Sequence, residues 1–509
     1  MKLEDDHNPP LTEAPAPALA GQRLLLRRRC IFRHWSGSQL SDPKLGVVIV
    51  GGGFSGTVLA VQLLRRTPDL RVAIVDKAFA PGRGLAYGTE CRCHLLNVPA
   101  GNMSALPEEP DHFLNWARAN YQGSVQARSF LPRALYGRYV GSSLEQAIAS
   151  AGCGNFQWIQ GEALSLTRAH SKVNVQLSDG RELPTKAVVL AMGNFPPANP
   201  KIPGLAECSE RYVPFAWSAT ALEDIPKNGS VLLIGSGLTS LDLAIGLKAK
   251  GFAGRIDILS RRGLIPQRHQ QNRSWPQFWS ERSPRTTLGL LRLIRQQARL
   301  ASEAGVDWRA VVDALRPVTQ RMWKSLPLDE RRRFLRHLRS YWEVHRHRIA
   351  PEIADIIADL AHEGQVRLYA GRVTDYRERW DGVEVAFRER RSGVQHLITA
   401  DRVINCTGSE SDCRRIEDPL IMSLFAQGLA RPDPLFPGLD VDEEGALLDC
   451  SRTPSQSLYA IGPARKGCLW ETTAVPEIRT QASQLAEHLV SRLRKRTRYA
   501  GSTLSETAV

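Results

Sequence analysis

The chain contains two closely similar stretches, each with an apolar segment, a glycine-rich turn and the beginning of a helix. The first is VVIVGGGFSGTVLA at residues 47–60, and the second is VLLIGSGLTSLDLA at residues 231–244. An apolar strand that passes through such a turn into a helix is typical of dinucleotide-binding α/β units, in which the helix N-terminus faces a pyrophosphate. Two such units in one chain predict two Rossmann-like domains and two dinucleotides.

The first turn has the full spacing of a dinucleotide-binding motif. Gly51 permits the tight turn, Gly53 lets a pyrophosphate approach the backbone, and Gly56 lets the helix pack on its strand. Asp76 follows about 20 residues later, at the end of the next apolar segment, where a carboxylate accepts both ribose hydroxyls of an adenosine. This combination predicts that the first unit binds FAD.

The second turn has Gly235, Gly237 and Ser240, and its strand end differs from that of the first unit. Ser260 stands where the first unit has its acid, and Arg261 and Arg262 follow it. An acid would repel a 2′-phosphate, whereas arginine binds a phosphate bidentately. The second unit is therefore predicted to bind NADPH, and the alternative is that both arginines are solvated charges at a strand end.

The order of apolar segments predicts an α/β fold in which the NAD(P) domain is inserted into the FAD domain. Two apolar strands, ending near Gly193 and Gly408, are expected to carry the two crossings between the domains. A stretch of helical periodicity adds a helical insertion. The expected division is a disordered tail over 1–44, an FAD-binding domain over 45–225 and again over 396–493, an NAD(P)H-binding domain over 226–395 with its helical insert at about 284–362, and a flexible tail over 494–509.

Composition narrows the surroundings and partners of the protein. Its net charge is +15, but the arginines are spread along the chain and no nucleic-acid-binding motif is evident, so we expect no nucleic-acid partner. No apolar run approaches the roughly 20 residues that span a bilayer. The nine cysteines include one C-x-C, Cys91 and Cys93, and no C-x-x-C, which argues against a redox dithiol, a zinc ribbon or a disulfide scaffold. We therefore expect a cytoplasmic protein.

Further motifs resemble a known family. GRGLAYGT at 82–89, HLLNVPAGNMS at 94–104, FLPRALYGRYV at 130–140 and WETTAVPEIRTQA at 470–482 are similar to those of a bacterial family of FAD/NAD(P)-binding oxidoreductases, some of which are described as FAD-dependent urate hydroxylases. The resemblance covers about residues 45–490. It implies two dinucleotide-binding domains, FAD and a reduced nicotinamide, and it leaves the substrate open.

Motif and resemblance together assign a set of cofactor-binding residues. These are Gly51, Gly53, Phe54, Ser55, Gly56, Asp76, Lys77, Gly84, Tyr87, Asn97, Met103, Gly193, Gly235, Gly237, Leu238, Thr239, Ser240, Arg261, Arg262, Gly408 and Gly462. Met103 has core packing as its alternative. Arg133 is expected to face a phosphate or a carboxylate, or to form an ion pair on its helix.

Three side chains are candidates for acid–base work, although the catalytic residue is not fixed. The alternative for Glu471 is a capping or ion-pair role. The alternative for His345 and His347 is that they belong to a solvated, basic helix end. No H-x-x-x-H signature with an acid partner occurs, so we predict no metal.

NADPH and FAD in one protein predict hydride transfer to the flavin. The leading hypothesis is a monooxygenase that uses molecular oxygen to hydroxylate a small organic substrate. The candidate substrates include anionic compounds and a purine such as urate. The alternatives are a reductase that passes electrons to a quinone or a partner protein, and a flavin-binding sensor or scaffold with little turnover. Residues 210–222 include Trp217 but lack the histidine expected in amine- and ketone-oxidising flavin monooxygenases, which speaks against those reactions.

Overall fold

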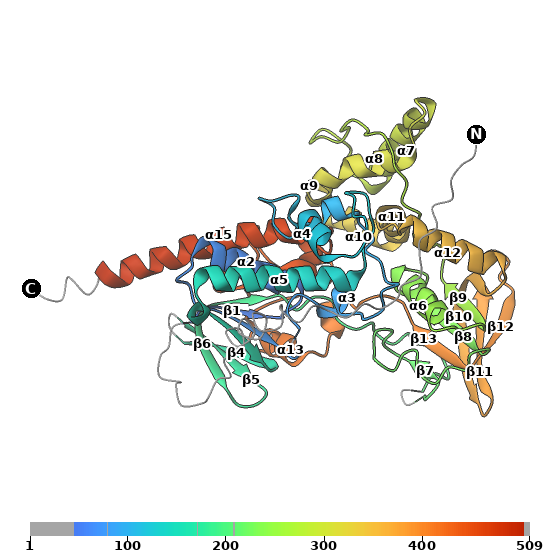
Figure 1. Cartoon of the computed structure of the whole chain (residues 1–509), viewed down its shortest axis with the longest axis horizontal. Helices are drawn as coiled ribbons and strands as arrows, with labels where there is room; N and C mark the ends of the chain where they lie inside the picture. Colours follow the sequence, from blue (N-terminus) through green and yellow to red (C-terminus); the bar gives the residue numbers. More distant parts are fainter. Residues whose placement is uncertain (1–44, 79, 170–171, 207–208, 503–509) are drawn as a thin grey trace, which may run out of the picture.

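The computed structural model describes residues 45–78, 80–169, 172–206 and 209–502. The predicted N-terminal tail over 1–44 and the end of the predicted C-terminal tail, 503–509, lie outside these residues. The described chain forms an eight-stranded and a seven-stranded sheet with helices packed on them (Figure 1). We call the part built on the first sheet, 45–193 and 408–502, the first domain, and the part built on the second sheet, 194–407, the second domain.

The first sheet has a parallel core in the order β15-β6-β1-β2-β3. Strands buried on both faces explain the uninterrupted apolar runs of the sequence. An antiparallel strand, β14, extends one edge. Strand β5 pairs antiparallel with both β4 and β6, and the turn from β5 to β6 contains Gly180. The strands are β1 (Leu45–Val50), β2 (Val72–Asp76), β3 (Phe156–Gln160), β4 (Ala163–Ala169), β5 (Lys172–Leu177), β6 (Glu182–Leu190), β14 (Ala446–Leu448) and β15 (Pro454–Ala460).

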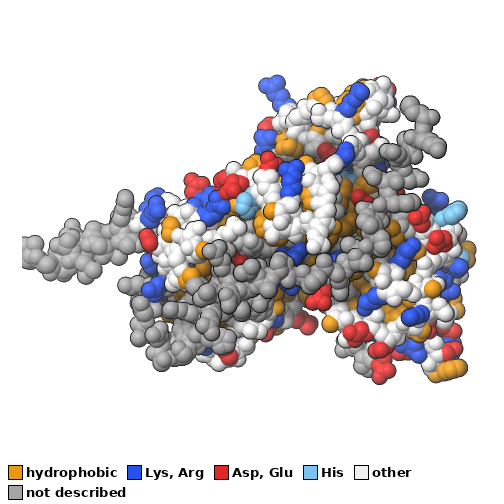
Figure 2. Space-filling view, in the orientation of Figure 1, with side chains coloured by type: hydrophobic (Ala, Val, Ile, Leu, Met, Phe, Trp, Pro, Cys, Tyr) orange, Lys and Arg blue, Asp and Glu red, His pale blue; other side chains and the backbone are white. Residues whose placement is uncertain are grey.

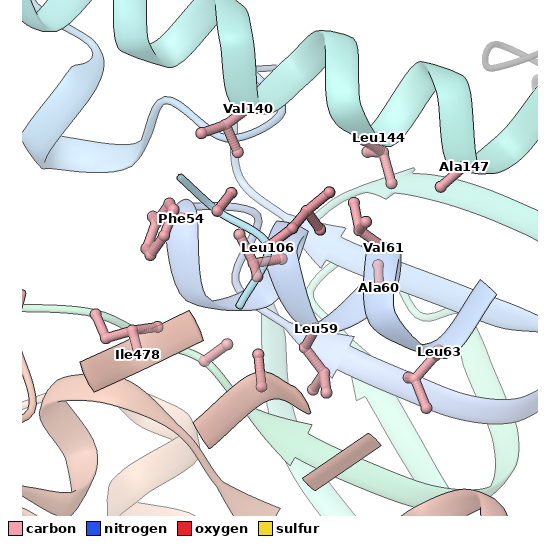
Figure 3. Packing of buried hydrophobic residues seen from close by; sticks show 14 of the residues in the cluster. Phe54, Leu59, Ala60, Val61, Leu63, Leu106, Val140, Leu144, Ala147 and Ile478 are labelled. Atoms are coloured by element: carbon pink, nitrogen blue, oxygen red, sulfur yellow. The ribbon is translucent and has the colours of Figure 1, made fainter. Parts of the chain in front are cut away.

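Helix α2 (Phe54–Arg66) is the centre of the first domain. It packs between the sheet and two longer helices, α5 (Arg133–Ala151) and α15 (Val475–Ser502), and its residues from Phe54 to Leu64 are buried. Figure 3 shows Val61 and Leu63 of α2 among side chains of α5 and α15. Shorter elements complete the domain: α3 (Gly84–Tyr87), η1 (Ala100–Asn102), α4 (His112–Asn120), η2 (Cys153–Asn155), η4 (Cys413–Arg415), α13 (Pro419–Ala426), η5 (Gly462–Arg465) and α14 (Lys466–Leu469).

The second sheet has the order β12-β11-β10-β9-β8-β13-β7, parallel from β10 to β7 and antiparallel from β10 to β12. Helix α6 (Leu238–Ala249) follows β8 as α2 follows β1, so the glycine turns occupy equivalent places. The strands are β7 (Tyr212–Val213), β8 (Ser230–Ile234), β9 (Arg255–Ser260), β10 (Val366–Arg379), β11 (Gly382–Glu389), β12 (Gln395–Ala400) and β13 (Arg402–Asn405).

Between β9 and β10 lies a run of helices, 287–362, which we call the helical insert. It comprises α7 (Thr287–Glu303), α8 (Trp308–Leu315), η3 (Arg316–Val318), α9 (Thr319–Ser325), α10 (Leu328–His337), α11 (Arg339–Arg346) and α12 (Pro351–His362). Helix α12 packs on α6 and β10 of its own domain. Trp323 stacks on Trp470 of the first domain at 5.2 Å between ring centroids, so the insert covers the segment before α15. Among the described helices, none combines the length and apolarity needed to cross a bilayer.

The chain crosses between the domains on two adjacent segments. Phe195, after β6, and Glu410, after β13, form an antiparallel bridge. Gly193 and Gly408 precede these residues with φ of +68° and +89°, a region that favours glycine. The predicted α/β fold, with one Rossmann-like domain inserted into the other, is confirmed.

Element boundaries differ from the expectation in two places. The second sheet includes β7 before residue 226 and β12 and β13 after 395, because these strands hydrogen-bond to the second sheet and not to the first. Helix α15 continues to Ser502, beyond the expected end at Leu493, because residues 494–500 contain neither proline nor glycine to stop it. The assignment of each domain to a cofactor stays a proposal.

Replacement of Gly56 by alanine tests the packing of α2 on the sheet. A Cβ on Gly56 would overlap the carbonyl oxygen of Gly51 and press on Ile49. We expect Gly56→Ala to lower the free energy of unfolding by about 1–3 kcal/mol in denaturant titrations. Gly154→Ala is the control, because its Cβ would meet no atom of the described chain within 4 Å. Equal stability of both variants would contradict this packing.

Candidate functional site

The first glycine turn leaves room above its second glycine. A Cβ on Gly51, where φ is +108°, would overlap the carbonyl oxygen of Ala191, so the protein itself requires glycine there. At Gly53 a Cβ would meet, among described atoms, only the Cα of Gly84 at 3.6 Å. The protein thus has no steric need for glycine at 53, whereas a pyrophosphate over the N-terminus of α2 would have one. The turn fits FAD on this ground.

Asp76 ends β2 beside the same turn. Its Oδ2 accepts a hydrogen bond from the backbone N–H of Gly52 at 2.5 Å, and its Oδ1 accepts one from Ala78 at 2.8 Å. The carboxylate is therefore held against the turn, where a ribose would lie. The predicted neighbour Lys77 instead forms an ion pair with Glu162 at 2.7 Å and is largely exposed.

The second glycine turn repeats this geometry with a neutral strand end. Gly235 has φ of +118°, and a Cβ there would overlap the carbonyl oxygen of Cys406. A Cβ on Gly237 would meet nothing within 4 Å in the described part of the chain. Ser236 Oγ donates to Ser260 Oγ at 2.7 Å, which places Ser260 where the first domain has Asp76. Leu238 and Thr239 are half-buried in the first turn of α6, and Ser240 is buried.

The two arginines after β9 have different surroundings. Arg262 donates to Ser340 Oγ at 2.9 Å and lies 5.7 Å from the ring of Tyr341, so it is held by α11 of the helical insert. Arg261 is exposed beside the strand end. Arg261 is consequently the more accessible of the two arginines.

Of the predicted flavin-side residues, Met103 is buried, whereas Tyr87 and Asn97 are half-buried. Tyr87 lies 6.0 Å from Phe54 and 4.7 Å from Tyr136 in an aromatic cluster, and its burial raises the pKa of its hydroxyl. Met103 is 2% exposed within the hydrophobic core, as its alternative interpretation anticipated. Asn97 is half-buried.

Ser55, at the N-terminus of α2, meets the end of β15. A Cβ on Gly462 would lie 2.5 Å from Ser55 Oγ, and the Gly462 N–H donates to Gln481 Oε1 of α15 at 3.1 Å. Thr472 donates its hydroxyl to the Gly462 carbonyl at 2.9 Å. The N-termini of α2 and α15 are thus brought together, so that both can face one bound flavin nucleotide.

Glu471 is buried where the helical insert covers the segment before α15. Its Oε1 accepts a hydrogen bond from Trp342 Nε1 at 2.7 Å, and Arg346 lies 3.8 Å from its Oε2. Burial alone would raise the pKa of Glu471, but the charges of His347 and Arg346 outweigh it and lower the pKa. Burial lowers the pKa of His347. These contacts agree with the ion-pair alternative for Glu471.

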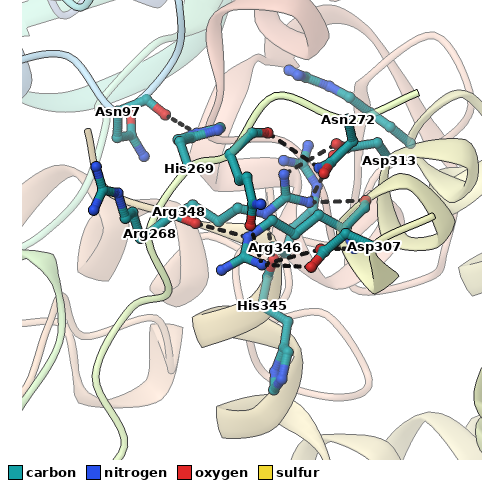
Figure 4. Close-up of polar contacts among 12 residues, drawn as sticks. Asn97, Arg268, His269, Asn272, Asp307, Asp313, His345, Arg346 and Arg348 are labelled. Carbon is teal, nitrogen blue, oxygen red and sulfur yellow. Dashed lines mark hydrogen bonds and ion pairs between the residues drawn. The ribbon is translucent and has the colours of Figure 1, made fainter. Parts of the chain in front are cut away.

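Arg348 and His345 of the helical insert take part in a second polar cluster (Figure 4). Arg348 is paired with Asp313 at 2.8 Å and donates to the carbonyl of His345. His345 Nδ1 contacts the carbonyl of Tyr341, so this half-buried histidine is engaged within α11. Neither histidine candidate is therefore distinguished as a catalytic base.

His269 is a candidate that the sequence analysis missed. Its Nε2 lies 3.0 Å from the carbonyl oxygen of Asn97, which joins the loop after β9 to the first domain (Figure 4). Because a carbonyl only accepts, Nε2 carries the proton. Burial lowers the pKa of His269 to about 4. In the sequence, the one feature that could have pointed to His269 is its place in the loop after Ser260, which corresponds in position to Asp76 of the first unit.

A second missed feature is a polar bridge between the domains. Arg133 pairs with Asp242 of α6 at 2.8 Å, with side-chain exposures of 14% and 9%. His94 Nε2 lies 3.0 Å from the Asp242 carbonyl oxygen, and its ring meets Trp217 edge-on at 5.6 Å. We call Arg133, His94 and Asp242 the interdomain bridge. Arg133 thus faces a carboxylate across the domain boundary, and its ion pair is not the one on its own helix that was the alternative.

Cys91 and Cys93 are joined by a disulfide, a single bond and not the disulfide scaffold that the cysteine spacing argued against. The residues are adjacent to the interdomain bridge. Ligand atoms of Cys91, Cys93 and His94 lie within 4.8 Å of one another. Both ring nitrogens of His94 are already engaged, Nδ1 with Thr89 Oγ1 at 2.7 Å and Nε2 with Asp242.

The similarity to known proteins agrees with this geometry. Residues 48–195 match a family model described as FAD-NAD(P)-binding. This part of the chain is similar to the FAD-NAD(P)-binding family. The family resemblance read from the sequence is confirmed for the first unit.

Solved structures extend the similarity over both domains. The reduced form of ornithine hydroxylase from Pseudomonas aeruginosa matches with a TM-score of 0.59 at 17% identity, over 88% of this chain and 99% of that one. The FAD-bound cadaverine monooxygenase of desferrioxamine biosynthesis from Erwinia amylovora matches with a TM-score of 0.60 at 15% identity, over 87% of this chain and 94% of that one. Ornithine N-hydroxylase from Kutzneria sp. 744, with reduced FAD, NADP+ and L-ornithine, matches with a TM-score of 0.57 at 14% identity, over 88% of this chain and 100% of that one. The two-domain fold is shared with these proteins.

The surface charges are mixed rather than gathered. On the face shown in Figure 2, basic and acidic side chains are interspersed over both domains. Several are paired, such as Arg268 with Asp355 at 2.6 Å. The net charge of +15 is therefore not concentrated into a basic patch on this face.

Gly53→Ala tests whether the open turn holds FAD. The new methyl group finds space in the protein but occupies the place of the pyrophosphate. We expect the variant to fold with unchanged unfolding temperature and to bind FAD about ten- to hundredfold more weakly, by flavin-to-protein absorbance after titration. Gly237→Ala is the matched control and should keep its FAD. Full FAD content in Gly53→Ala would show that the turn does not hold FAD.

The pKa of His269 predicts a pH-dependent contribution to stability. Its ordinary pKa of 6.5 is lowered to about 4 in the folded protein, so the unfolded chain takes up the proton first as pH falls. The stability associated with neutral His269 is complete above about pH 6.5 and is lost as pH falls towards 4. His269→Gln keeps a donor for the Asn97 carbonyl and cannot titrate.

Thermal unfolding of wild type and His269→Gln at several pH values between 4 and 7 measures this contribution. We expect the unfolding temperature of the wild type to fall more steeply. Parallel curves for the two proteins would mean that His269 has an ordinary pKa in the folded state.

Proposed function

We propose that the protein is an NADPH-dependent FAD monooxygenase that hydroxylates a small amine. The observation that carries this proposal is the pair of open glycine turns, at Gly53 and Gly237, in two domains whose connecting segments lie side by side. Bound together, FAD and NADPH supply hydride transfer from the nicotinamide to the flavin and the reduction of oxygen. The protein's part would be to hold the two cofactors at the turns of Gly53 and Gly237.

The division of the chain between the cofactors follows the strand ends. Asp76 beside the first turn favours the unmodified ribose of FAD, and Ser260 with Arg261 beside the second favours the 2′-phosphate of NADPH. The N-terminus of α15, at Val475, lies close to Ser55 through Gly462 and Gln481. Its partial positive charge would stabilise a reduced, anionic flavin ring.

The choice of an amine rests on an acidic group near this region. Glu477, in the first turn of α15, has a buried Oε2 without a hydrogen-bond partner among the described residues, while its Oε1 accepts from Arg316 at 3.2 Å and from Arg346 at 3.5 Å. An unsatisfied buried carboxylate oxygen is a ready acceptor for an amine N–H. Ornithine and cadaverine, after which these structural relatives are named, are amines.

This choice revises the substrates expected from sequence. Nothing in the structure or in these relatives supports a purine, and an anionic substrate has no specific support. The histidine missing from residues 210–222 had spoken against amine oxidation. His94 of the first domain contacts Trp217 of that segment, so an imidazole lies beside it in space although not in sequence.

NADPH oxidation across a panel of diamines, amino acids and purines, run under heavy-isotope oxygen gas, tests the proposal. We expect one class of amine to stimulate NADPH oxidation and the product to carry the isotope. Oxidation with an added quinone but without labelled product would establish the reductase instead. Failure of NADPH to be consumed under any condition would leave the sensor or scaffold.

Arg261→Ala tests the choice of nicotinamide. Loss of a charge-assisted contact to the 2′-phosphate should raise the apparent constant for NADPH about ten- to hundredfold. NADH lacks that phosphate and should change little. Arg262→Ala is the comparison, because Arg262 is held by Ser340 and its loss should loosen α11 and affect both coenzymes. Unchanged NADPH binding in Arg261→Ala would refute the assignment.

A further inference from the structure

The disulfide between Cys91 and Cys93 contributes little to holding the fold together. Only one residue separates the cysteines, so the bond closes a very short loop. The stabilisation that a disulfide provides through the unfolded chain increases with loop length. A bond that stabilises so little is better explained by its chemistry than by a structural role.

The disulfide is partly accessible to solvent and lies beside the domain boundary. Cys91 and Cys93 are half-buried, while His94 directly after them is buried. The His94 N–H donates to the Cys91 carbonyl at 3.3 Å, and the Cys91 N–H donates to Thr89 Oγ1 at 3.3 Å. The disulfide therefore lies within the same small turn that orients the His94 ring.

The ring of His94 connects this turn to the second domain by its hydrogen bond to Asp242. Because the Asp242 carbonyl accepts from Nε2, Nδ1 is the unprotonated nitrogen and accepts the Thr89 hydroxyl. Asp242 also pairs with Arg133, whose Nε donates to the carbonyl of Leu95. Both ends of the 89–95 turn are thus tied to one carboxylate-bearing residue of α6.

We propose that Cys91 and Cys93 form a reversible thiol–disulfide site whose state sets the strength of the interdomain bridge. Reduction breaks the bond between the two sulfur atoms. Two electrons and two protons come from an external dithiol, which itself becomes a disulfide, and two thiols remain. The opened turn no longer fixes His94 against Thr89 and Asp242, so the contact of the first domain with α6 loosens.

Hydrogen–deuterium exchange of the full chain tests this site without relying on enzymatic activity. Air-oxidised protein is compared with protein reduced by dithiothreitol, and amide exchange is followed in the 89–95 turn and in α6. We expect exchange in both to accelerate on reduction by on the order of tenfold, the factor that corresponds to about one lost buried hydrogen bond.

Two variants control the experiment. Cys93→Ser should exchange like the reduced wild type under both conditions. Cys450→Ser removes an exposed cysteine away from the turn and should respond to reduction as the wild type does. A wild type in which maleimide labels both Cys91 and Cys93 after air oxidation would overturn the proposal, as would unchanged exchange in α6 on reduction.

Zinc provides a further discriminating arm. Ligand atoms of Cys91, Cys93 and His94 lie within 4.8 Å of one another, but both ring nitrogens of His94 are already engaged. We expect the reduced protein to take up no zinc at this turn. Stoichiometric zinc binding that is lost in His94→Asn would make the turn a metal site and overturn the thiol–disulfide assignment.

Discussion

Each domain depends on a close contact between its glycine turn and the segment by which the chain leaves that domain. A Cβ on Gly51 would overlap the carbonyl of Ala191, and one on Gly235 would overlap that of Cys406. Ala191 directly follows β6 and Cys406 directly follows β13. The backbone that could hold a dinucleotide is therefore packed on the backbone that connects the domains, and the two turns are positioned relative to each other through these segments.

Side chains that meet across the boundary complete this arrangement. Arg133 and Asp242 form a nearly buried ion pair, and His94 and His269 reach carbonyl oxygens on opposite domains. Burial of an ion pair is costly unless its hydrogen bonds are satisfied, so such a pair favours one relative placement of the domains over others. The helical insert adds aromatic packing at Trp470 and closes the side near α15.

Local features of the sequence were enough to predict the fold, because a glycine turn and its flanking apolar strands are contiguous in the chain. Gly51, Gly53 and Asp76 could be recognised from spacing alone. The interdomain contacts could not, since Asp242 shows no partner in sequence and its pairing with Arg133 arises only when α5 and α6 are placed together. His269 was missed for the same reason, and the contact of Arg262 with Ser340 could not be predicted because Ser340 belongs to a distant helix.

If the two turns hold two dinucleotides in proximity, hydride passes from NADPH to FAD within one protein molecule. Anaerobic rapid mixing of FAD-loaded protein with NADPH measures this transfer directly through the loss of oxidised flavin absorbance. We expect NADPH to bleach the flavin in a single phase whose rate saturates with NADPH concentration. Flavin that stays oxidised in the presence of saturating, demonstrably bound NADPH would contradict it.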